Sequence, residues 1–397
     1  MTTLCIVGGS LAGLSTARAL RNQGYDGRLV LVGEEHHRPY DRPPLSKAFL
    51  AGKLDVADLS LECEDEDLGL DWRLGVRAIG LDSTSRAVLL DSGESVHADG
   101  LVIATGSTAR TLAAGHGLDG LHVLRTLDDA LSLRDDLTGR PSLVVVGGGF
   151  IGSEIASTAR ALGLEVTLVS GGREPLRAQL GSFASVVSDL HADHGVRVIS
   201  DAMVNGFTGA GRVDGVVLDD GRRLQADRVV LGIGAVPNTD FLLGSDVEVD
   251  DGVVCGMNGS TSVPGVVAVG DCAAWFDPVV GHYSRVEHWT GARERAAIAA
   301  TTLLSGGTAP LPRLRAPYFW SDLYDVRLQF AGHPELADSV TLESGSIDDR
   351  SFLAVYRREG VAVAALAMNH TKPFTAIRRT LVSGHEAATR SMQGASA

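Results

Sequence analysis

The sequence Leu4-Cys-Ile-Val-Gly-Gly-Ser-Leu-Ala-Gly13 decides the fold class of this chain. Residues 4–7 are apolar and partly β-branched, as expected for a parallel strand that is covered on both faces. Gly8 permits a tight turn, and Gly13 allows the following helix to lie close to the strand. The free N–H groups and the dipole at the start of such a helix favour an anion, so the stretch predicts a phosphate-binding site.

The same unit occurs a second time, at Leu143-Val-Val-Val-Gly-Gly-Gly-Phe-Ile-Gly152. Gly147, Gly149 and Gly152 complete the G-x-G-x-x-G pattern, whereas Ser10 occupies the place of the second glycine in the first copy. Serine is small, so we expect a pyrophosphate still to fit there. Two strand–glycine–helix units in one chain predict two dinucleotides bound by duplicated domains.

Length and charge exclude several classes of protein. A chain of 397 residues predicts two or three domains. The formal net charge of −14 argues against nucleic-acid binding and against an anionic membrane surface. No apolar run approaches the ~20 residues of a membrane span, and no basic segment precedes the first apolar run. We therefore expect no membrane partner, no signal peptide and a cytoplasmic location.

The four cysteines, Cys5, Cys63, Cys255 and Cys272, are far apart in the sequence. They form no Cys-x-x-Cys pair and no zinc knuckle, so we expect no metal site and no dithiol chemistry. Cys5 and Cys272 lie in apolar runs, which favours small buried hydrophobic residues.

Charged residues follow the second expected strand, residues 28–33. An acid at this point, here Glu34, accepts hydrogen bonds from the adenosine ribose in dinucleotide-binding folds, although solvation alone also explains an acid after a strand. The next segment, residues 38–47, holds three prolines that fix an extended loop. Arg42 and Lys47 on so rigid a loop suit a ligand; the alternative is a surface turn with ordinary charges.

The remaining apolar and glycine-rich segments predict the other elements. Strands are expected at 72–81, 87–90, 101–106, 166–169, 212–218, 222–224, 228–234, 265–271, 328–331, 352–356 and 361–368. Helices are expected at 153–162, 289–304 and 374–383, with a linker at 305–315 and a frayed tail at 386–397. We expect an α/β protein with a discontinuous first dinucleotide domain (1–110 and 238–308), a second one (111–237) and a C-terminal α+β domain (309–397).

Seven short segments, in order along the chain, carry a family resemblance. They are Pro39-Tyr-Asp-Arg-Pro-Pro-Leu-Ser-Lys47, Ala104-Thr-Gly106, Gly147-Gly-Gly-Phe-Ile-Gly-Ser-Glu154, Gly232-Ile-Gly-Ala-Val-Pro-Asn238, Val269-Gly-Asp271, Arg285-Val-Glu-His-Trp289 and Pro317-Tyr-Phe-Trp-Ser-Asp322. The chain thereby resembles FAD-dependent pyridine-nucleotide ferredoxin reductases of the putidaredoxin reductase and biphenyl dioxygenase reductase type. The resemblance implies two Rossmann-like domains in a glutathione-reductase-like arrangement, the first binding FAD and the second NADH or NADPH.

The resemblance also implies roles for single residues. Ala12 and Glu34 would meet the adenosine end of FAD, Ala78 its adenine through the backbone, and Asp271 its ribityl chain. Glu287, His288 and Trp289 would open a helix whose N-terminus points at the flavin, where a positive end stabilises the anion of the reduced ring. The other expected cofactor contacts are Thr105, Gly106, Arg125, Ile151, Gly234 and the glycines of both turns.

Lys47 and Glu154 resemble a pair that faces flavin N5, where hydride arrives from the nicotinamide. An ammonium there would stabilise developing negative charge. The alternative for Glu154 is an acid favoured by the dipole of its helix. Trp320 resembles an aromatic residue near the flavin on the ferredoxin side; the alternative is a core tryptophan. By resemblance, the electrons pass singly to an iron–sulfur ferredoxin, which serves a monooxygenase or a dioxygenase.

The nicotinamide specificity stays open. NADH-preferring relatives carry an acid where Ser170 stands; serine would not repel a 2′-phosphate, and Arg173 could pair with one. Glu174 weakens the case for NADPH. Docking of an acidic ferredoxin needs a local basic patch, because the chain itself is acidic. The candidate residues for that patch are Arg313, Arg315, Lys372, Arg378 and Arg379.

Two other functions remain as alternatives. An NAD(P)H oxidase, or another NAD(P)H-dependent flavin, peroxide or disulfide reductase, would share the fold, but such enzymes usually place a cysteine near positions 38–50. A flavin-binding signalling or interaction protein would not need Lys47 and Glu154.

Overall fold

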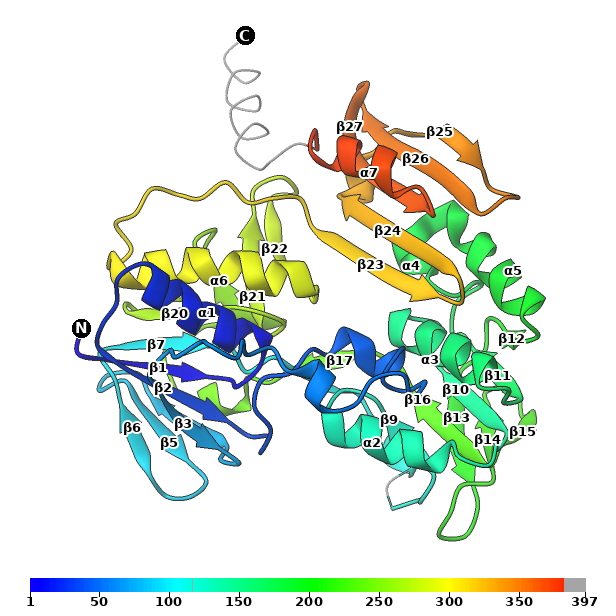
Figure 1. The fold of residues 1–397 in the computed structure, drawn as a ribbon, viewed down its shortest axis with the longest axis horizontal. Helices are drawn as coiled ribbons and strands as arrows, with labels where there is room; N and C mark the ends of the chain where they lie inside the picture. Colours follow the sequence, from blue (N-terminus) through cyan, green and yellow to red (C-terminus); the bar gives the residue numbers. More distant parts are fainter. Residues whose placement is uncertain (116, 382–397) are drawn as a thin grey trace.

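Three five-stranded sheets organise the computed structural model, which describes residues 1–115 and 117–381 (Figure 1). The first two sheets each belong to a module with its own helices, and the third closes the chain beyond them. Within the described part of the chain, we find no helix whose length and apolar character would let it span a membrane.

The first sheet is parallel and lies at the blue end of the chain in Figure 1. In spatial order its strands are β20 (Val266–Ala268), β7 (Gly100–Ile103), β1 (Thr3–Val7), β2 (Arg28–Gly33) and β3 (Leu70–Leu74). The helices α1 (Leu11–Asn22) and α6 (Trp289–Leu304) pack against each other on this module. Because β20 follows the whole second module in the sequence, the first module is discontinuous.

The second sheet is also parallel and repeats this architecture. In spatial order its strands are β12 (Arg197–Ile199), β11 (Val166–Val169), β10 (Leu143–Val146), β16 (Arg228–Leu231) and β9 (Leu121–Val123). Its helices are α2 (Leu127–Asp136), α3 (Phe150–Ala161), α4 (Arg177–Leu180) and α5 (Ser185–Asp193). The helix expected from residue 153 begins earlier, at Phe150, because Gly149 already serves as its N-cap.

Among the described residues, four small sheets and five turns of 3-10 helix complete the two modules, and a sixth 3-10 turn lies in the C-terminal unit. The strands are β4 (Ala78–Asp82), β5 (Ala87–Leu90), β6 (Ser95–His97), β8 (Ser107–Ala109), β13 (Val204–Thr208), β14 (Gly215–Leu218), β15 (Arg223–Gln225), β17 (Ala235–Pro237), β18 (Val249–Asp250), β19 (Gly252–Cys255), β21 (Ala273–Asp277) and β22 (His282–Arg285). The 3-10 turns are Pro43–Ser46, Ala57–Leu59, Ala113–Gly115, Gly181–Ala184, Asp240–Leu242 and Pro334–Leu336, the last of them in the third unit. The β8–β17 pair joins the two chain segments that cross between the modules.

The third sheet is antiparallel and forms the C-terminal unit. In spatial order its strands are β23 (Tyr318–Leu323), β24 (Val326–Gly332), β27 (Val361–Met368), β26 (Ser351–Arg358) and β25 (Ser339–Ser346). Side chains of α5 share a buried apolar cluster with one face of this sheet, and α7 (Thr371–Arg378) packs Phe374 against the other. The C-terminal unit therefore rests on the second module.

Most expected elements are confirmed, including the α/β fold class, the strands 28–33, 87–90, 166–169 and 361–368 and the helix 289–304. The single strand expected at 72–81 is wrong: Gly75, at a φ of +71°, separates β3 from β4. The helix expected at 374–383 is α7, which begins at residue 371 and ends at 378. The frayed tail lies outside the described residues, and the domain boundaries stay a prediction.

Candidate functional site

A cavity of about 560 Å³ lies at the carboxyl ends of β1 and β7 and reaches the start of α3 and of α6. Ligands of open α/β sheets bind at this edge. The expected site residues that line it are Gly8, Ser10, Ala12, Glu34, Arg42, Lys47, Ala78, Thr105, Gly106, Arg125, Ile151, Glu154, Asp271, Glu287, His288, Trp289 and Trp320. The structure therefore gathers residues from ten separate parts of the sequence around one space.

Two glycines around the start of α1, Gly8 and Gly13, leave no room for a side chain. Gly8 has a φ of +130°, and a Cβ added to it would lie 1.9 Å from the carbonyl oxygen of Ala104. A Cβ on Gly13 would lie 2.0 Å from the carbonyl oxygen of Gly8. Ser10 is the N-cap of α1, and its side chain makes no capping hydrogen bond. The N-terminus of α1 is thereby placed against the cavity, where an anion is favoured.

Two consecutive acids follow β2, and they differ in their surroundings. Glu34, the expected ribose ligand, is 65% exposed, and its nearest cation within residues 1–115 and 117–381 is Arg77 at 3.9 Å. Glu35, which the sequence did not single out, accepts a hydrogen bond of 2.6 Å from Arg42. Both acids line the cavity. The guanidinium of Arg42 also donates to Ser10 Oγ at 3.3 Å, so it lies at the start of α1.

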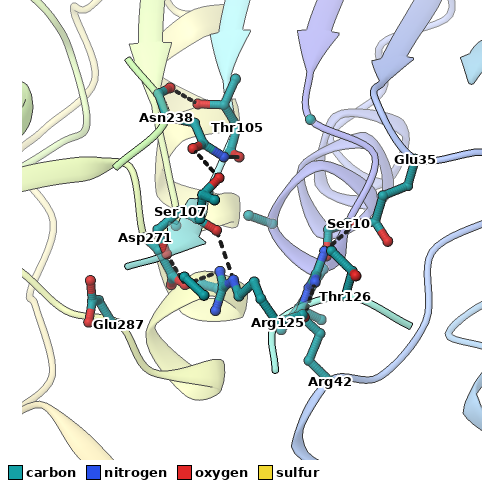
Figure 2. Close-up of a pocket in the computed structure, with 18 of the residues that line it drawn as sticks. Ser10, Glu35, Arg42, Thr105, Ser107, Arg125, Thr126, Asn238, Asp271 and Glu287 are labelled. Carbon is teal, nitrogen blue, oxygen red and sulfur yellow. Dashed lines mark hydrogen bonds and ion pairs between the residues drawn. The ribbon is translucent and has the colours of Figure 1, made fainter. Parts of the chain in front are cut away.

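A second cation–anion pair lies across the cavity from Ser10 (Figure 2). Arg125 donates to Asp271 Oδ2 at 2.6 Å and to the carbonyl oxygen of Ser107 at 2.8 Å. Asn238 donates to the carbonyl oxygen of Thr105 at 3.0 Å, and Thr105 Oγ1 donates back to the carbonyl oxygen of Asn238 at 2.6 Å. These bonds hold together the two chain segments that connect the modules, and Asp271 is fixed beside them.

Glu154 is the most deeply buried charged group that lines the cavity. Its side chain is 5% exposed, and its Oε2 accepts hydrogen bonds from Lys47 Nζ at 2.6 Å and from Ser46 Oγ at 2.5 Å. Its Oε1 accepts a third, from Ser321 Oγ of β23, at 2.7 Å. A buried carboxylate needs such partners. The expected Lys47–Glu154 contact is present, and it joins the first module, the second module and the third sheet.

The start of α6 brings two aromatic residues to the cavity. Trp289 donates its indole N–H to Asp41 Oδ1 at 2.7 Å, and burial raises the pKa of Asp41. The ring of Trp289 meets the edge of Trp320 at a centroid distance of 5.9 Å. Burial lowers the pKa of His288, the N-cap residue, to about 4, so its imidazole is neutral at pH 7. His288 therefore adds no charge of its own to the positive end of the α6 dipole.

The second glycine turn lies outside this cavity. A Cβ on Gly147, at a φ of +112°, would lie 2.2 Å from the carbonyl oxygen of Gly232, whereas Gly149 has no close neighbour. Ser170 is 3% exposed at the end of β11, and the Arg173 side chain is 79% exposed. The other expected residues outside the cavity are Gly13, beneath the first turn, and Gly152 and Gly234.

The opposite charges near Ser170 partly cancel. Glu174 lies 3.8 Å from Arg173 and 3.1 Å from Arg177. Arg177 was not predicted, because the sequence does not show that α4 turns it back toward Glu174. The loop thus carries one more cation than anion.

The cavity residues fit FAD. A helix N-terminus with Arg42 suits a diphosphate, a short carboxylate at Asp271 suits hydroxyl groups, and Lys47 supplies a cation at the far end. Within residues 1–115 and 117–381, no cysteine lines the cavity, and no group of three metal-binding side chains exists. Cys5 is buried in the first core, and burial raises its pKa to about 12.

The sequence missed several residues that shape the site. Glu35, Tyr40, Asp41, Ser46 and Ser321 make hydrogen bonds to expected site residues or to one another. Four of them stand inside or next to the proline-rich loop, which was the available signal. Ser321 comes from a strand of the last unit, and nothing in its local sequence predicts a contact with Glu154.

The comparisons with known proteins agree with this geometry. Residues 2–296 match the pyridine nucleotide-disulphide oxidoreductase family, and residues 318–396 match the reductase C-terminal family. The chain is 38% identical over 381 residues to the ferredoxin reductase component of chlorobenzene dioxygenase from Cupriavidus sp. (strain PS12), covering 95% of this chain and 92% of that protein. It is 37% identical over 380 residues to the biphenyl dioxygenase system ferredoxin–NAD(+) reductase component from Paraburkholderia xenovorans (strain LB400), with the same coverage.

A solved structure gives the same result at the level of the fold. The reductase in the crystal structure of the covalent putidaredoxin reductase–putidaredoxin complex superposes with a TM-score of 0.90 at 32% sequence identity. The match covers 95% of this chain and 92% of that one.

Proposed function

This chain belongs to the pyridine nucleotide-disulphide oxidoreductase family, and we propose that it carries electrons from NAD(P)H through FAD to an iron–sulfur ferredoxin of an oxygenase system. The observation that carries the proposal is the Lys47–Glu154 pair, which lies in a cavity that no cysteine of the described residues lines. The two relatives named above, whose matches cover 95% of this chain, are ferredoxin reductase components. The expected family, enzyme class and cofactors are thereby confirmed.

When bound, FAD accepts two electrons as hydride from NAD(P)H and releases them one at a time. The residues of this chain would bind FAD, orient it and stabilise charge on its flavin ring. The N-terminus of α1 and Arg42 would hold the diphosphate, and Asp271 would hold hydroxyl groups of the ribityl chain. The positive end of the α6 dipole would stabilise negative charge on the flavin ring.

Lys47 would supply a fixed positive charge where negative charge develops on the flavin. Glu154 and its serine donors keep the ammonium of Lys47 at one position: the Nζ–Oε2 distance is 2.6 Å and the lysine side chain is 19% exposed. Glu154 also stands at the start of α3, beside Phe150 and Ile151. We propose that this end of the cavity receives the nicotinamide, while the glycine turn at 147–152 receives its diphosphate.

A row of three aromatic side chains indicates where a ferredoxin would dock. Trp289, Trp320 and Tyr318 follow one another at centroid distances of 5.9 and 6.0 Å. Arg378 stacks on Tyr318 at 3.8 Å, and Arg313 and Arg315 line a hollow beside it. We propose that this basic and aromatic surface receives the acidic ferredoxin, and that Lys372 of α7 and Arg379, its C-cap residue, add to the positive charge. Opposite charge favours a docked encounter of this kind.

A cytoplasmic location is part of the proposal. The four cysteines are free thiols, and Cys5, Cys255 and Cys272 are buried. Unpaired cysteines are typical of proteins in a reducing compartment.

Steady-state reduction of cytochrome c by NADH or NADPH tests the function, with and without an added two-iron ferredoxin. We expect rapid reduction only when the ferredoxin is present. Rapid consumption of NAD(P)H with oxygen, peroxide or a free flavin as the sole acceptor would instead indicate an oxidase or a flavin reductase. Tight FAD binding without turnover on any acceptor would indicate a signalling or interaction protein.

A further inference from the structure

Both carboxylate oxygens of Glu35 are engaged at the edge of the cavity. Oε1 accepts a hydrogen bond of 2.6 Å from Arg42 Nη2, and Oε2 accepts one of 2.5 Å from the hydroxyl group of Tyr40. The Glu35 and Arg42 side chains are 27% and 23% exposed, and both line the cavity on the side of Ser10 (Figure 2). The pair is therefore partly shielded from solvent, so its attraction is stronger than that of a surface ion pair.

Arg42 makes two further contacts that fix its direction. Its Nε donates to Ser10 Oγ at 3.3 Å, and its Nη1 donates to the carbonyl oxygen of Arg125 at 2.5 Å. A guanidinium has five N–H donors, and these three bonds use one from each nitrogen. One N–H on each of the two terminal nitrogens is left over. Two free donors on one guanidinium suit a phosphate group, which arginine often binds through two N–H groups.

Tyr40 connects this arrangement to the second module. Its hydroxyl group accepts a hydrogen bond of 2.9 Å from the backbone N–H of Leu127, the first residue of α2. Tyr40 is 6% exposed, and burial raises its pKa, so the phenol stays neutral and donates its proton to Glu35. Glu35 thus contacts both Tyr40 and Arg42 of the same loop, and Arg42 in turn contacts Ser10 at the start of α1.

We propose that Glu35 is a positioning residue for the diphosphate of the dinucleotide at α1: it holds Arg42 with two N–H groups directed at the phosphates. The inference rests on the proposed function only in that FAD is the dinucleotide. Glu34 is 65% exposed and, among the described residues, has no cation closer than Arg77 at 3.9 Å, so it is left for the ribose. The two neighbouring acids thereby have different roles: Glu34 contacts the ligand directly, and Glu35 acts through Arg42.

A double-mutant cycle on the purified holoprotein tests this assignment, with the dissociation constant of FAD measured by flavin fluorescence after dilution. We expect Glu35→Gln to raise that constant about tenfold and Arg42→Met to raise it at least as much, because coupled charge pairs contribute on this scale. The double variant should lie within about twofold of Arg42→Met alone. Glu62→Gln is the matched control, because Glu62 pairs with Arg38 of the same loop at 3.2 Å and does not line the cavity.

Two results would overturn the assignment. Either Glu35→Gln leaves FAD retention unchanged, or its effect persists undiminished when Arg42 is already methionine, as a direct ribose contact or a general structural role would give. If Glu35→Gln yields no folded protein, Tyr40→Phe, which removes only the hydroxyl group, completes the same cycle with Arg42→Met. The cycle measures FAD retention and no turnover, so it stays valid whichever acceptor takes the electrons. A wild-type protein that holds no FAD would overturn the proposed function as well.

Discussion

Replacing Lys47 by alanine tests the electrostatic role of the Lys47–Glu154 pair. The substitution removes a cation that lies 2.6 Å from a carboxylate of which only 5% is exposed. At that distance and an effective dielectric constant of about 20, the two charges attract by about 6 kcal/mol before desolvation is subtracted. Ser46 and Ser321 still donate to Glu154 in the variant, so the protein should fold with a loss of about 2–3 kcal/mol, below the usual range for a fully buried pair.

The effect on flavin reduction should be about as large, in free energy, as the effect on folding. Removing one preorganised electrostatic group from a shielded site slows catalysis by about 10²–10³-fold. The Lys47 side chain is 19% exposed, so water in the variant replaces part of the electrostatic stabilisation that the ammonium gave. The lower end of the 10²–10³-fold range therefore applies. We expect flavin reduction by NAD(P)H to slow about 100-fold, or about 2.7 kcal/mol in activation free energy.

Anaerobic stopped-flow absorbance of the flavin measures that rate directly. Lys53→Ala is the matched control, since Lys53 is exposed and does not line the cavity. The double variant Lys47→Ala with Glu154→Gln removes the unpaired carboxylate, so it should regain stability but not speed. A Lys47→Ala protein that retains FAD and is reduced within about twofold of the wild-type rate would refute the reasoning.

Three further predictions concern other parts of the molecule. If Arg173 binds a 2′-phosphate, Arg173→Ala should lower kcat/KM for NADPH about tenfold and leave NADH unchanged; equal effects on both cofactors would make it a surface residue. Burial lowers the pKa of His191 to about 4 from 6.5, so the unfolded chain binds more protons between these values and stability falls as the pH falls through the window. His191→Gln should reduce that loss, by up to about 3 kcal/mol in the free energy of unfolding, and an unchanged pH dependence in urea titrations would contradict it. Arg378→Ala together with Arg313→Ala should weaken ferredoxin reduction at low salt about tenfold, without changing flavin reduction; a salt-insensitive wild-type rate would count against the docking surface.

Local sequence was sufficient for the parts of the fold that depend on short-range rules. The two glycine turns, the buried strands before them and the helix from Trp289 to Leu304 follow from residue spacing and backbone sterics. β25 was missed because it has only two large apolar residues, Val340 and Leu342, and both are exposed. β23 was missed because its residues are only partly buried, as its side chains face both the cavity and other units.

The site was predictable only where a motif carries its own chemistry. Lys47 and Glu154 were expected together from the resemblance, and the structure brings them into contact across 107 positions of sequence. The serines that complete this pair come from residues 46 and 321, and such convergence depends on how the third sheet packs on α3. The same limit applies to Glu34 and Glu35, because two adjacent acids differ only in the direction that the chain takes after β2.

The most direct test of the account is an anaerobic single-turnover reaction of the NAD(P)H-reduced protein with an oxidised two-iron ferredoxin. Hydride carries two electrons and each ferredoxin accepts one, so the account predicts that two ferredoxins are reduced for each flavin. It also predicts that this reoxidation is much faster than reoxidation by dissolved oxygen or by a disulfide. Equal rates with and without ferredoxin would contradict the account.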